Sequence, residues 1–296
     1  MDRLDAMRLF TRVVERRSFT LAAHDVGAPR STVTEVIKQM EARLGVRLLQ
    51  RTTRVVSPTL DGEAYYRRCL SILADVESAE GAFLGARPSG VLRIDVQGTL
   101  ARHFLLPHLP AFLAEHPAIE ISMSETERWI DIVREGVDCV LRYGNLGDSE
   151  MIVRRVTTLE RVTCATPGYL EQHGVPADLA ALEGHRMIGL RSYTSGALRP
   201  LEFSDDGVLR EMLLPAPVSV TGTESFLAMA RLGLGLFQPP LFHVAADLAA
   251  GTLVEILPHH RPAPVPVSLL YPPTRQLSPR VRVFLDWAAA TFAGGA

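Results

Sequence analysis

The sequence predicts a multidomain α+β protein, with helices concentrated in the first third and alternating strands and helices in the rest. Three observations lead to this prediction. Residues 33–44 carry apolar side chains at helical spacing, residues 59–84 continue a helical pattern without a break, and after residues 85–90 short strands and helices alternate. A chain of 296 residues, 47% apolar and 22% charged, can form two or three domains with separate cores.

Two helices and a turn are predicted at the start of the chain. The first runs from Asp2 to Arg16, because apolar residues recur on one side of it. Ser18 is suited to cap the second helix, since its hydroxyl can accept a hydrogen bond from a first-turn N–H. Residues 26–29 then make a tight turn, Pro29 suits the first position of a third helix, and Gly45 suits its end.

The third predicted helix has an apolar face and a polar face. Apolar residues recur at i, i+3, i+4, i+7 and i+11, which is one helical stripe: Val33, Val36, Ile37, Met40 and Leu44. Two helices joined by a glycine-containing turn, the second polar outward, are typical of a helix-turn-helix that reads DNA. The residues of this helix expected to contact DNA are Arg30, Ser31, Thr32, Thr34, Glu35 and Lys38.

These side chains suit different contacts. Arg30 can donate to guanine or phosphate and Lys38 to phosphate, while Ser31 and Thr34 can reach the backbone or a base edge. Glu35 is the exception, because a carboxylate near DNA is repelled unless it accepts from a cytosine amino group or orients an arginine. The alternative for all of them is a solvated helix face.

Residues 46–58 indicate a β-hairpin, since two short extended pieces flank a basic tip at 50–54. Such a wing would place its tip beside the DNA backbone or in the minor groove. The alternative is a solvated hairpin with incidental arginines. The expected DNA contacts of the wing are Arg51, Thr52, Thr53 and Arg54.

A long helix is predicted from Thr59 to about Leu84. Apolar residues along it alternate at spacings of three and four, which suits either a dimer contact or packing within one chain. The prediction favours the dimer, because little else would cover this helix. The residues of this seam are Tyr65, Cys69, Ile72, Val76, Ala79 and Phe83. Residues 85–90, with glycine and proline at both ends, form the clearest domain linker.

Strands and helices alternate from residue 91 onward, which predicts an α/β domain with mostly parallel sheets. The predicted strands are 91–96, 119–124, 138–142, 152–156, 161–165, 217–220, 234–238, 253–255 and 265–270. The predicted helices are 102–115, 129–135, 167–173, 224–232, 241–249 and 279–292.

Charge is distributed unevenly. Residues 1–60 hold eleven Lys or Arg against six Asp or Glu, a net charge of +5 in a chain whose total is −2. A basic module on an acidic body places a polyanion contact at the N-terminus, although so small an excess also arises by chance. No signal peptide and no run of 18 apolar residues is present, so we expect a cytoplasmic protein and no membrane partner.

The side chains that carry chemistry are scattered. The three cysteines, Cys69, Cys139 and Cys164, are far apart, which favours reduced thiols over a disulfide or zinc site. Cys164 is open to a redox role, but a small buried side chain is the favoured interpretation. No nucleotide-binding or nucleophile motif occurs, so no enzyme activity, metal or cofactor is expected.

The motifs together resemble those of LysR-type transcriptional regulators, and the resemblance covers essentially the whole chain. The N-terminal motifs are Ser18-Phe19-Thr20-x-Ala22-Ala23, Met40-Glu41-x-x-Leu44-Gly45-Val46-x-Leu48-Leu49, Arg51-Thr52-Thr53-Arg54 and Thr59-x-x-Gly62. The downstream motifs include Gly90-Val91-Leu92-Arg93-Ile94, Leu106-Pro107-x-Leu109, Glu135-Gly136-Val137-Asp138 and Gly233-Leu234-Gly235-Leu236. Pro29, Arg30 and Glu35 depart from residues that are common in the family, which puts the target sequence in doubt.

The resemblance implies a domain organisation. It predicts a winged helix-turn-helix at 1–58, a linker and dimerisation helix with hinge at 59–89, and an effector domain at 90–296. The effector domain would resemble periplasmic binding proteins, with one subdomain at about 90–160 and 267–296 and a second at about 161–266. Members commonly assemble as dimers of dimers on a partly palindromic promoter, so a homodimer or homotetramer is expected.

An effector site is expected between the two subdomains, where ligands of such folds bind. Residues 97–100 follow a strand and start a helix, so their N–H groups and the Thr99 hydroxyl could hold an anion. The residues expected to bind the effector are Gly98, Thr99, Leu100, Thr126, Arg142, Tyr193, Thr221 and Thr223. Each also has a structural alternative: Thr99 and Thr223 could be helix caps, and Arg142 could form an ion pair.

The leading hypothesis is a sequence-specific DNA-binding transcriptional regulator that responds to a small molecule. The expected partners are double-stranded promoter DNA, an organic acid or aromatic effector, RNA polymerase and further copies of the chain. One alternative is a DNA-binding architectural or silencing protein without an effector. Another is a small-molecule binding protein or enzyme of the binding-protein fold, against which the N-terminal module counts.

Overall fold

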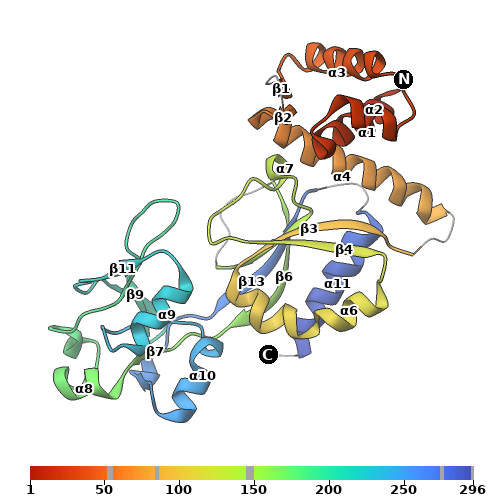
Figure 1. Cartoon of the computed structure of the whole chain (residues 1–296). Helices are drawn as coiled ribbons and strands as arrows, with labels where there is room; N and C mark the ends of the chain where they lie inside the picture. The colour runs from red at the N-terminus through yellow and green to blue at the C-terminus, as the bar shows by residue number, and fades with distance from the viewer. Residues whose placement is uncertain (52–55, 84–86, 145–149, 274–276, 295–296) are drawn as a thin grey trace.

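The computed structural model places an N-terminal domain at one end of a long helix and a two-lobed domain below it (Figure 1). The structure describes residues 1–51, 56–83, 87–144, 150–273 and 277–294. The N-terminal domain contains helices α1 (Arg3–Arg16), α2 (Phe19–Asp25) and α3 (Arg30–Leu44), and a hairpin of β1 (Leu49–Arg51) and β2 (Val56–Pro58). Helix α4 (Leu60–Phe83) follows.

Local signals define the N-terminal helices. Asp2 and Asp5 form a capping box at the start of α1, and the Ser18 hydroxyl accepts from the Leu21 N–H at the start of α2, as predicted. Gly45 ends α3 with a φ of 72°. Pro29 is the cap residue before α3 and not its first helical residue, which corrects the prediction. The core of this domain includes Leu9, Phe10, Val13, Phe19, Val33, Ile37 and Met40.

The wing is joined to both neighbouring helices by short contacts. The Glu41 carboxylate on α3 accepts hydrogen bonds from the Leu48 and Leu49 N–H groups, at 2.8 and 3.0 Å. The Thr59 hydroxyl donates to the Arg47 carbonyl at 2.6 Å and accepts from the Gly62 N–H at 2.9 Å. A Cβ on Gly62 would lie 1.9 Å from the Leu48 carbonyl oxygen, so α4 can start here only with glycine at 62.

The first lobe of the C-terminal domain, lobe 1, is built on a five-stranded sheet of order β4-β3-β5-β13-β6. Its strands are β3 (Gly90–Val96), β4 (Ile119–Glu125), β5 (Cys139–Tyr143), β6 (Ile152–Leu159) and β13 (Val265–Tyr271). Strands β3, β4 and β5 are parallel, but β13 is antiparallel to both β5 and β6. The sheet is therefore mixed: β13 runs against the other four strands, which share one direction.

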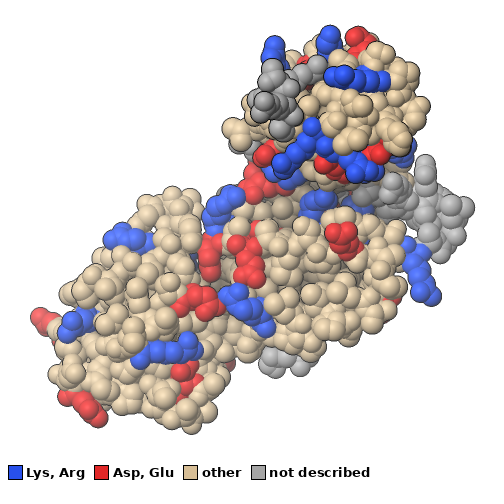
Figure 2. All heavy atoms as spheres, in the orientation of Figure 1, with Lys and Arg blue, Asp and Glu red and all other residues tan. Residues whose placement is uncertain are grey.

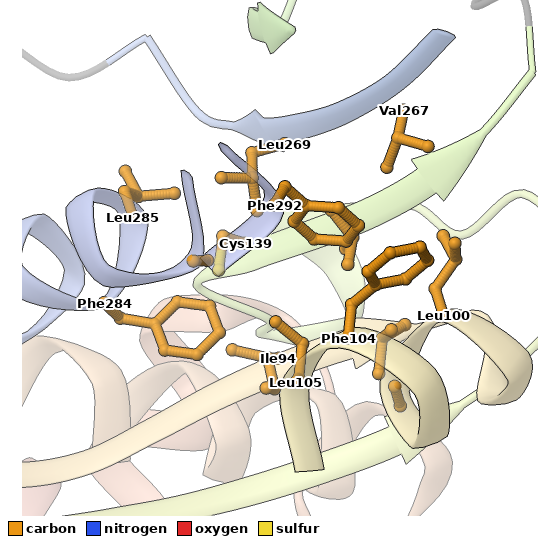
Figure 3. Close-up of a cluster of buried hydrophobic side chains, with 14 of the residues drawn as sticks. Ile94, Leu100, Phe104, Leu105, Cys139, Val267, Leu269, Phe284, Leu285 and Phe292 are labelled. Atoms are coloured by element: carbon orange, nitrogen blue, oxygen red, sulfur yellow. The ribbon is translucent and has the colours of Figure 1, made fainter. Parts of the chain in front are cut away.

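Helices cover this sheet with an aromatic core (Figure 3). The predicted helix 102–115 is instead α5 (Gly98–Leu100), a π-helical turn η1 (Ala101–Leu105), a 3-10 turn η2 (Leu106–His108) and α6 (Leu109–Glu115). The other helices are α7 (Ile132–Glu135) and α11 (Pro279–Gly294). The ring centroids of Phe104 and Phe292 lie 4.6 Å apart, and those of Phe112 and Phe284 lie 6.0 Å apart, so η1 and α6 pack on α11.

The second lobe, lobe 2, is formed by the short strands and helices that lie between β6 and β13 in the sequence. They are β7 (Thr163–Ala165), α8 (Pro167–His173), η3 (Ala180–Leu182), β8 (Gly189–Leu190), β9 (Leu201–Asp205), β10 (Val208–Met212), β11 (Ser219–Val220), α9 (Thr223–Arg231), α10 (Leu241–Ala250), β12 (Val254–Ile256) and η4 (Pro258–His260). The predicted strand 234–238 makes only isolated bridges, through Leu236 and Phe237. The hairpin of β9 and β10 was not predicted.

The described helices include none that is both long enough and apolar enough to cross a membrane.

The contact at Gly62 gives a first prediction. Replacing Gly62 with Ala forces the Leu48 backbone and α4 apart, so we expect the free energy of unfolding of the N-terminal domain to fall by about 1–3 kcal/mol. Hydrogen exchange of core amides such as that of Ile37 would measure it. Gly168→Ala is the matched control, because a Cβ there would meet nothing within 4 Å. Equal protection in both variants would contradict this account of the joint.

Candidate functional site

The polar face of α3 is open to solvent. Arg30, Ser31, Thr32, Glu35 and Lys38 are exposed and Thr34 is half-buried, so one helix presents all six expected DNA contacts. The Glu35 carboxylate accepts a hydrogen bond from the Gln39 amide at 3.0 Å, so it is oriented by an amide and not by an arginine. Leu44, expected on the apolar stripe, is exposed instead. Figure 2 shows basic side chains spread over this domain.

The expected contacts of the wing fall at the edge of what the structure describes. Arg51 ends strand β1 and pairs with Val56 of β2. Thr52, Thr53 and Arg54 lie outside the described residues. Residues 45–48 separate the end of α3 from the start of strand β1.

Helix α4 is shared between the domains, which changes the interpretation of its apolar seam. Cys69 is fully buried in the N-terminal core, and Tyr65 packs against Phe10 with ring centroids 5.5 Å apart. These two positions therefore serve packing within the chain, contrary to the prediction. Ile72 and Val76 are half-buried, and the side chains of Ala79 and Phe83 lie outside the description.

A cleft of about 420 Å³ lies between lobe 1 and lobe 2. Six of the eight residues expected to bind an effector line it: Thr99, Leu100, Arg142, Tyr193, Thr221 and Thr223. Gly98 and Thr126 are not among its lining residues. Gly98 lies close to the Glu125 carboxylate and the Arg102 guanidinium, which form an ion pair at 2.9 Å.

The threonines of the cleft are not helix caps. Gln97 and Gly222 occupy the cap positions of α5 and α9, and neither helix start has a side-chain cap hydrogen bond. The hydroxyls of Thr99, Thr221 and Thr223 have no hydrogen-bond partner within the described residues. The capping alternative is therefore wrong, and these hydroxyls are available to a ligand.

Arg142 forms the ion pair that was its structural alternative. It is 4% exposed and donates to the Asp95 carboxylate, to the Thr126 hydroxyl at 3.0 Å and to the Arg128 carbonyl at 3.2 Å. Ser124 and Thr126 also donate to Asp95. A buried guanidinium with these partners is charge-compensated. Arg142 thus lines the cleft while Asp95 and Thr126 hold its guanidinium from behind.

Other cleft residues escaped the sequence prediction. The Tyr143 hydroxyl has no hydrogen-bond partner within the described residues, and burial raises the pKa of Tyr143 to about 12. Arg161 is paired with Glu202 at 2.6 Å. Arg199 lines the rim with no carboxylate partner in the described part of the chain. No sequence motif indicates that Tyr143 and Arg199 line the cleft, because they come from different lobes and face the same cleft only in the folded chain.

His243 is the most unusual group in the cleft wall. Both of its ring nitrogens are buried without a hydrogen-bond partner. Burial lowers the pKa of His243 to about 4, and the nearby Glu224 carboxylate offsets only part of this effect. The ring is therefore neutral at physiological pH and packs against Phe242, with ring centroids 4.0 Å apart.

The cleft presents groups that suit the binding of a small molecule. Burial raises the pKa of Cys69 to about 11 and of Cys164 to about 12, so both thiols stay protonated and unreactive. No cluster of His, Cys, Asp or Glu that could hold a metal occurs among the described residues. Unpaired hydroxyls, an unpaired guanidinium and the aromatic side chains of Trp129 and Tyr193 are groups that hold a planar or anionic small molecule.

Two family models match separate segments of the chain. The model described as a bacterial regulatory helix-turn-helix protein of the lysR family matches residues 4–63. The model described as a LysR substrate binding domain matches residues 85–293. The first covers the domain that exposes α3, and the second covers both lobes of the cleft.

Relatives match along the whole length. The chain is 37% identical to the uncharacterized HTH-type transcriptional regulator YhjC of Escherichia coli K12, over 98% of this chain and 97% of that protein. It is 35% identical to an HTH-type transcriptional repressor of Pseudomonas aeruginosa, over 99% and 93%. The solved structure of CrgA, a LysR-type transcriptional regulator from Neisseria meningitidis, is similar with a TM-score of 0.61 and 30% identity, covering 97% and 98% of the two chains.

The buried imidazole gives a pH prediction. In the unfolded chain His243 takes up a proton below about pH 6.5, whereas in the folded chain it does so only near pH 4. The folded state therefore loses up to about 3 kcal/mol of stability as the pH falls from 6.5 to 4. We expect His243→Leu to be less sensitive to acid than the wild type when unfolding by urea is followed from pH 8 to pH 4. Phe242→Leu changes a neighbouring residue that does not titrate, so its free energy of unfolding should depend on pH as that of the wild type does. If the stability of His243→Leu shows the same pH dependence as the wild type, the His243 ring is not buried in its neutral form.

Proposed function

The chain belongs to the LysR family of bacterial transcriptional regulators, and on this premise we propose that it binds specific promoter sequences and responds to a small-molecule effector held between lobe 1 and lobe 2. The family consists of DNA-binding regulators with a substrate-binding domain and not of enzymes. The observation that carries the proposal is that one chain joins an exposed polar helix, α3, to a cleft with unpaired polar groups.

DNA reading is assigned to α3 and the wing. A helix in the major groove can use Arg30 and Ser31 at its N-terminal end for base edges and Lys38 for a phosphate. Glu35 lies on the same exposed face, where its carboxylate suits the amino group of a cytosine. The remaining proposed contacts are Thr32 and Thr34 on α3, and Arg51, Thr52, Thr53 and Arg54 in the wing.

Assembly and domain division are part of the proposal. The division is a DNA-binding domain at 1–58, a linker helix and hinge at 59–89 and an effector domain at 90–296. Because Tyr65 and Cys69 are used within the chain, a dimer contact through α4 would rely on Ile72, Val76 and the residues after them. Two copies would place their α3 helices about 34 Å apart, and two dimers would form a tetramer. A promoter-bound regulator also has RNA polymerase as a partner, and both lie in the bacterial cytoplasm.

The proposed effector is an organic acid or an aromatic compound. Thr99 and Thr223 stand in the first turns of helices that meet the cleft from opposite lobes, where backbone N–H groups favour an anion. Arg199 adds an unpaired positive charge at the rim, and Trp129 and Tyr193 supply apolar faces from the two lobes. An effector that touches both lobes would stabilise one relative arrangement of them.

Lys38 tests the DNA half of the proposal. Lys38→Gln should weaken binding to promoter DNA and reduce the slope of log affinity against log salt by about 1 per bound copy, because one phosphate contact is lost. Fluorescence anisotropy titrations at several salt concentrations measure both quantities. Arg210→Gln removes an exposed positive charge from β10 in lobe 2 and should change neither. An unchanged slope for Lys38→Gln would remove this residue from the interface.

Arg199 tests the effector half. Thermal shift of the full-length protein against a panel of aromatic and aliphatic carboxylates should find a compound that stabilises it, by about 2.7 kcal/mol at a hundredfold excess over Kd. Arg199→Gln should lose most of the shift, while Arg210→Gln keeps it. If no carboxylate or aromatic compound shifts the wild type, the architectural or silencing protein without an effector becomes the better account.

A further inference from the structure

Helix α4 is held at two places that belong to different domains. Its first half contributes Cys69 and Tyr65 to the N-terminal core. Its middle lies against lobe 1, where a Cβ on Gly136 would come within 3.0 Å of the Arg67 Cβ and where Asp75 meets Arg280. In Figure 1 the helix passes directly over the lobe that carries α7 and α11. A change in how lobe 1 holds α4 therefore moves the N-terminal domain with it.

Arg280 is the central group of this contact. It lies in the first turn of α11 and is 0% exposed. One of its terminal nitrogens, Nη2, lies 3.1 Å from the Asp75 carboxylate on α4 and 3.6 Å from the Asp138 carboxylate in lobe 1. Its Nε and Nη1 have no hydrogen-bond partner in the described part of the chain. A guanidinium buried this completely needs nearby negative charge, and these two carboxylates supply it.

Asp138 is fixed to the sheet, whereas Asp75 is not. The Asp138 carboxylate accepts from the Arg93 N–H at 2.8 Å, and its own N–H donates to the Arg93 carbonyl at 2.8 Å, which ties it to β3. The Asp75 side chain is 56% exposed, and within the described part of the chain it pairs only with Arg280. Arg280 therefore links Asp138, which is fixed in lobe 1, to the linker helix.

Strand β5 connects this contact to the cleft. It begins at Cys139, directly after Asp138, and ends at Tyr143, which lines the cleft beside Arg142. Five extended residues span about 16 Å and form a short rigid connection inside the sheet. The two ends of β5 thus lie at the linker helix and at the proposed effector site.

We propose that Arg280 is a positioning residue that fixes the linker helix α4 on lobe 1 by bridging Asp75 and Asp138, so that the effector domain sets the orientation of the DNA-binding domain. The bridge itself follows from the contacts above, and its regulatory role rests on the proposed function. A shift of β5 caused by a ligand would act on α4 through this bridge.

Hydrogen exchange of the full-length protein without DNA tests the bridge. Asp75→Asn should raise the exchange of amides in residues 67–76 at least tenfold and leave those of β3 and β5 unchanged. Asp75→Glu, which keeps the charge, should restore protection. Asp61→Asn, which removes a carboxylate from the exposed first turn of the same helix, is the matched control. Arg280→Met should loosen the same segment of α4, and if it does not fold, the Asp75 variants decide.

Three outcomes would overturn the proposal. One is wild-type exchange across α4 in Asp75→Asn, and the second is a loss of protection spread over the whole sheet. The third is dissociation of the oligomer in light scattering, which would make Asp75 a contact between copies. Because the bridge is proposed to set the orientation of the DNA-binding domain, the affinity of the Asp75→Asn variant for DNA should differ several-fold from that of the wild type. A wild type that binds no DNA would contradict the proposed function instead, while the exchange result would stand.

Discussion

The close approach of helix α4 to the Leu48 carbonyl is the constraint on which the rest of the structure depends. With no side chain at Gly62, the start of α4 can rest on the backbone at the base of the wing. Glu41 fixes the same backbone from the recognition helix, and Thr59 fixes it from the start of α4. Helix α3, the wing and α4 therefore meet at one point, and the direction of α4 is set relative to the surface proposed to read DNA.

The cleft combines a rigid wall with an open inner surface. Asp95 and Arg142 neutralise one another inside lobe 1, and the surrounding hydroxyls satisfy their remaining hydrogen bonds. Such a compensated pair holds the strand ends in place but offers little to a ligand. We therefore propose that a ligand is recognised by groups without partners, chiefly the threonines of the two helix starts and Arg199 at the rim.

Much of the fold was predictable from local signals, and the failures share a physical cause. Ser18 and Gly45 act within one helix end, so their roles could be identified from sequence. Cys69 and Arg142 could not, because their partners lie on α1 and β3, far along the chain. The hairpin of β9 and β10 has a local signal in the sequence, since Asp206-Gly207 is a favoured two-residue turn. The roles proposed for Arg280 and Arg199 depend on how the domains and lobes are arranged, which no local sequence pattern indicates.

The central claim is that this chain reads promoter DNA as a symmetric assembly whose recognition helices are held at fixed separation by α4. A footprint of the full-length protein over the intergenic region beside its own gene tests this most directly. The account predicts two protected half-sites of related sequence, with centres about 34 Å or a multiple of that distance apart. No protection at physiological salt, or a single half-site without a symmetric mate, would contradict it.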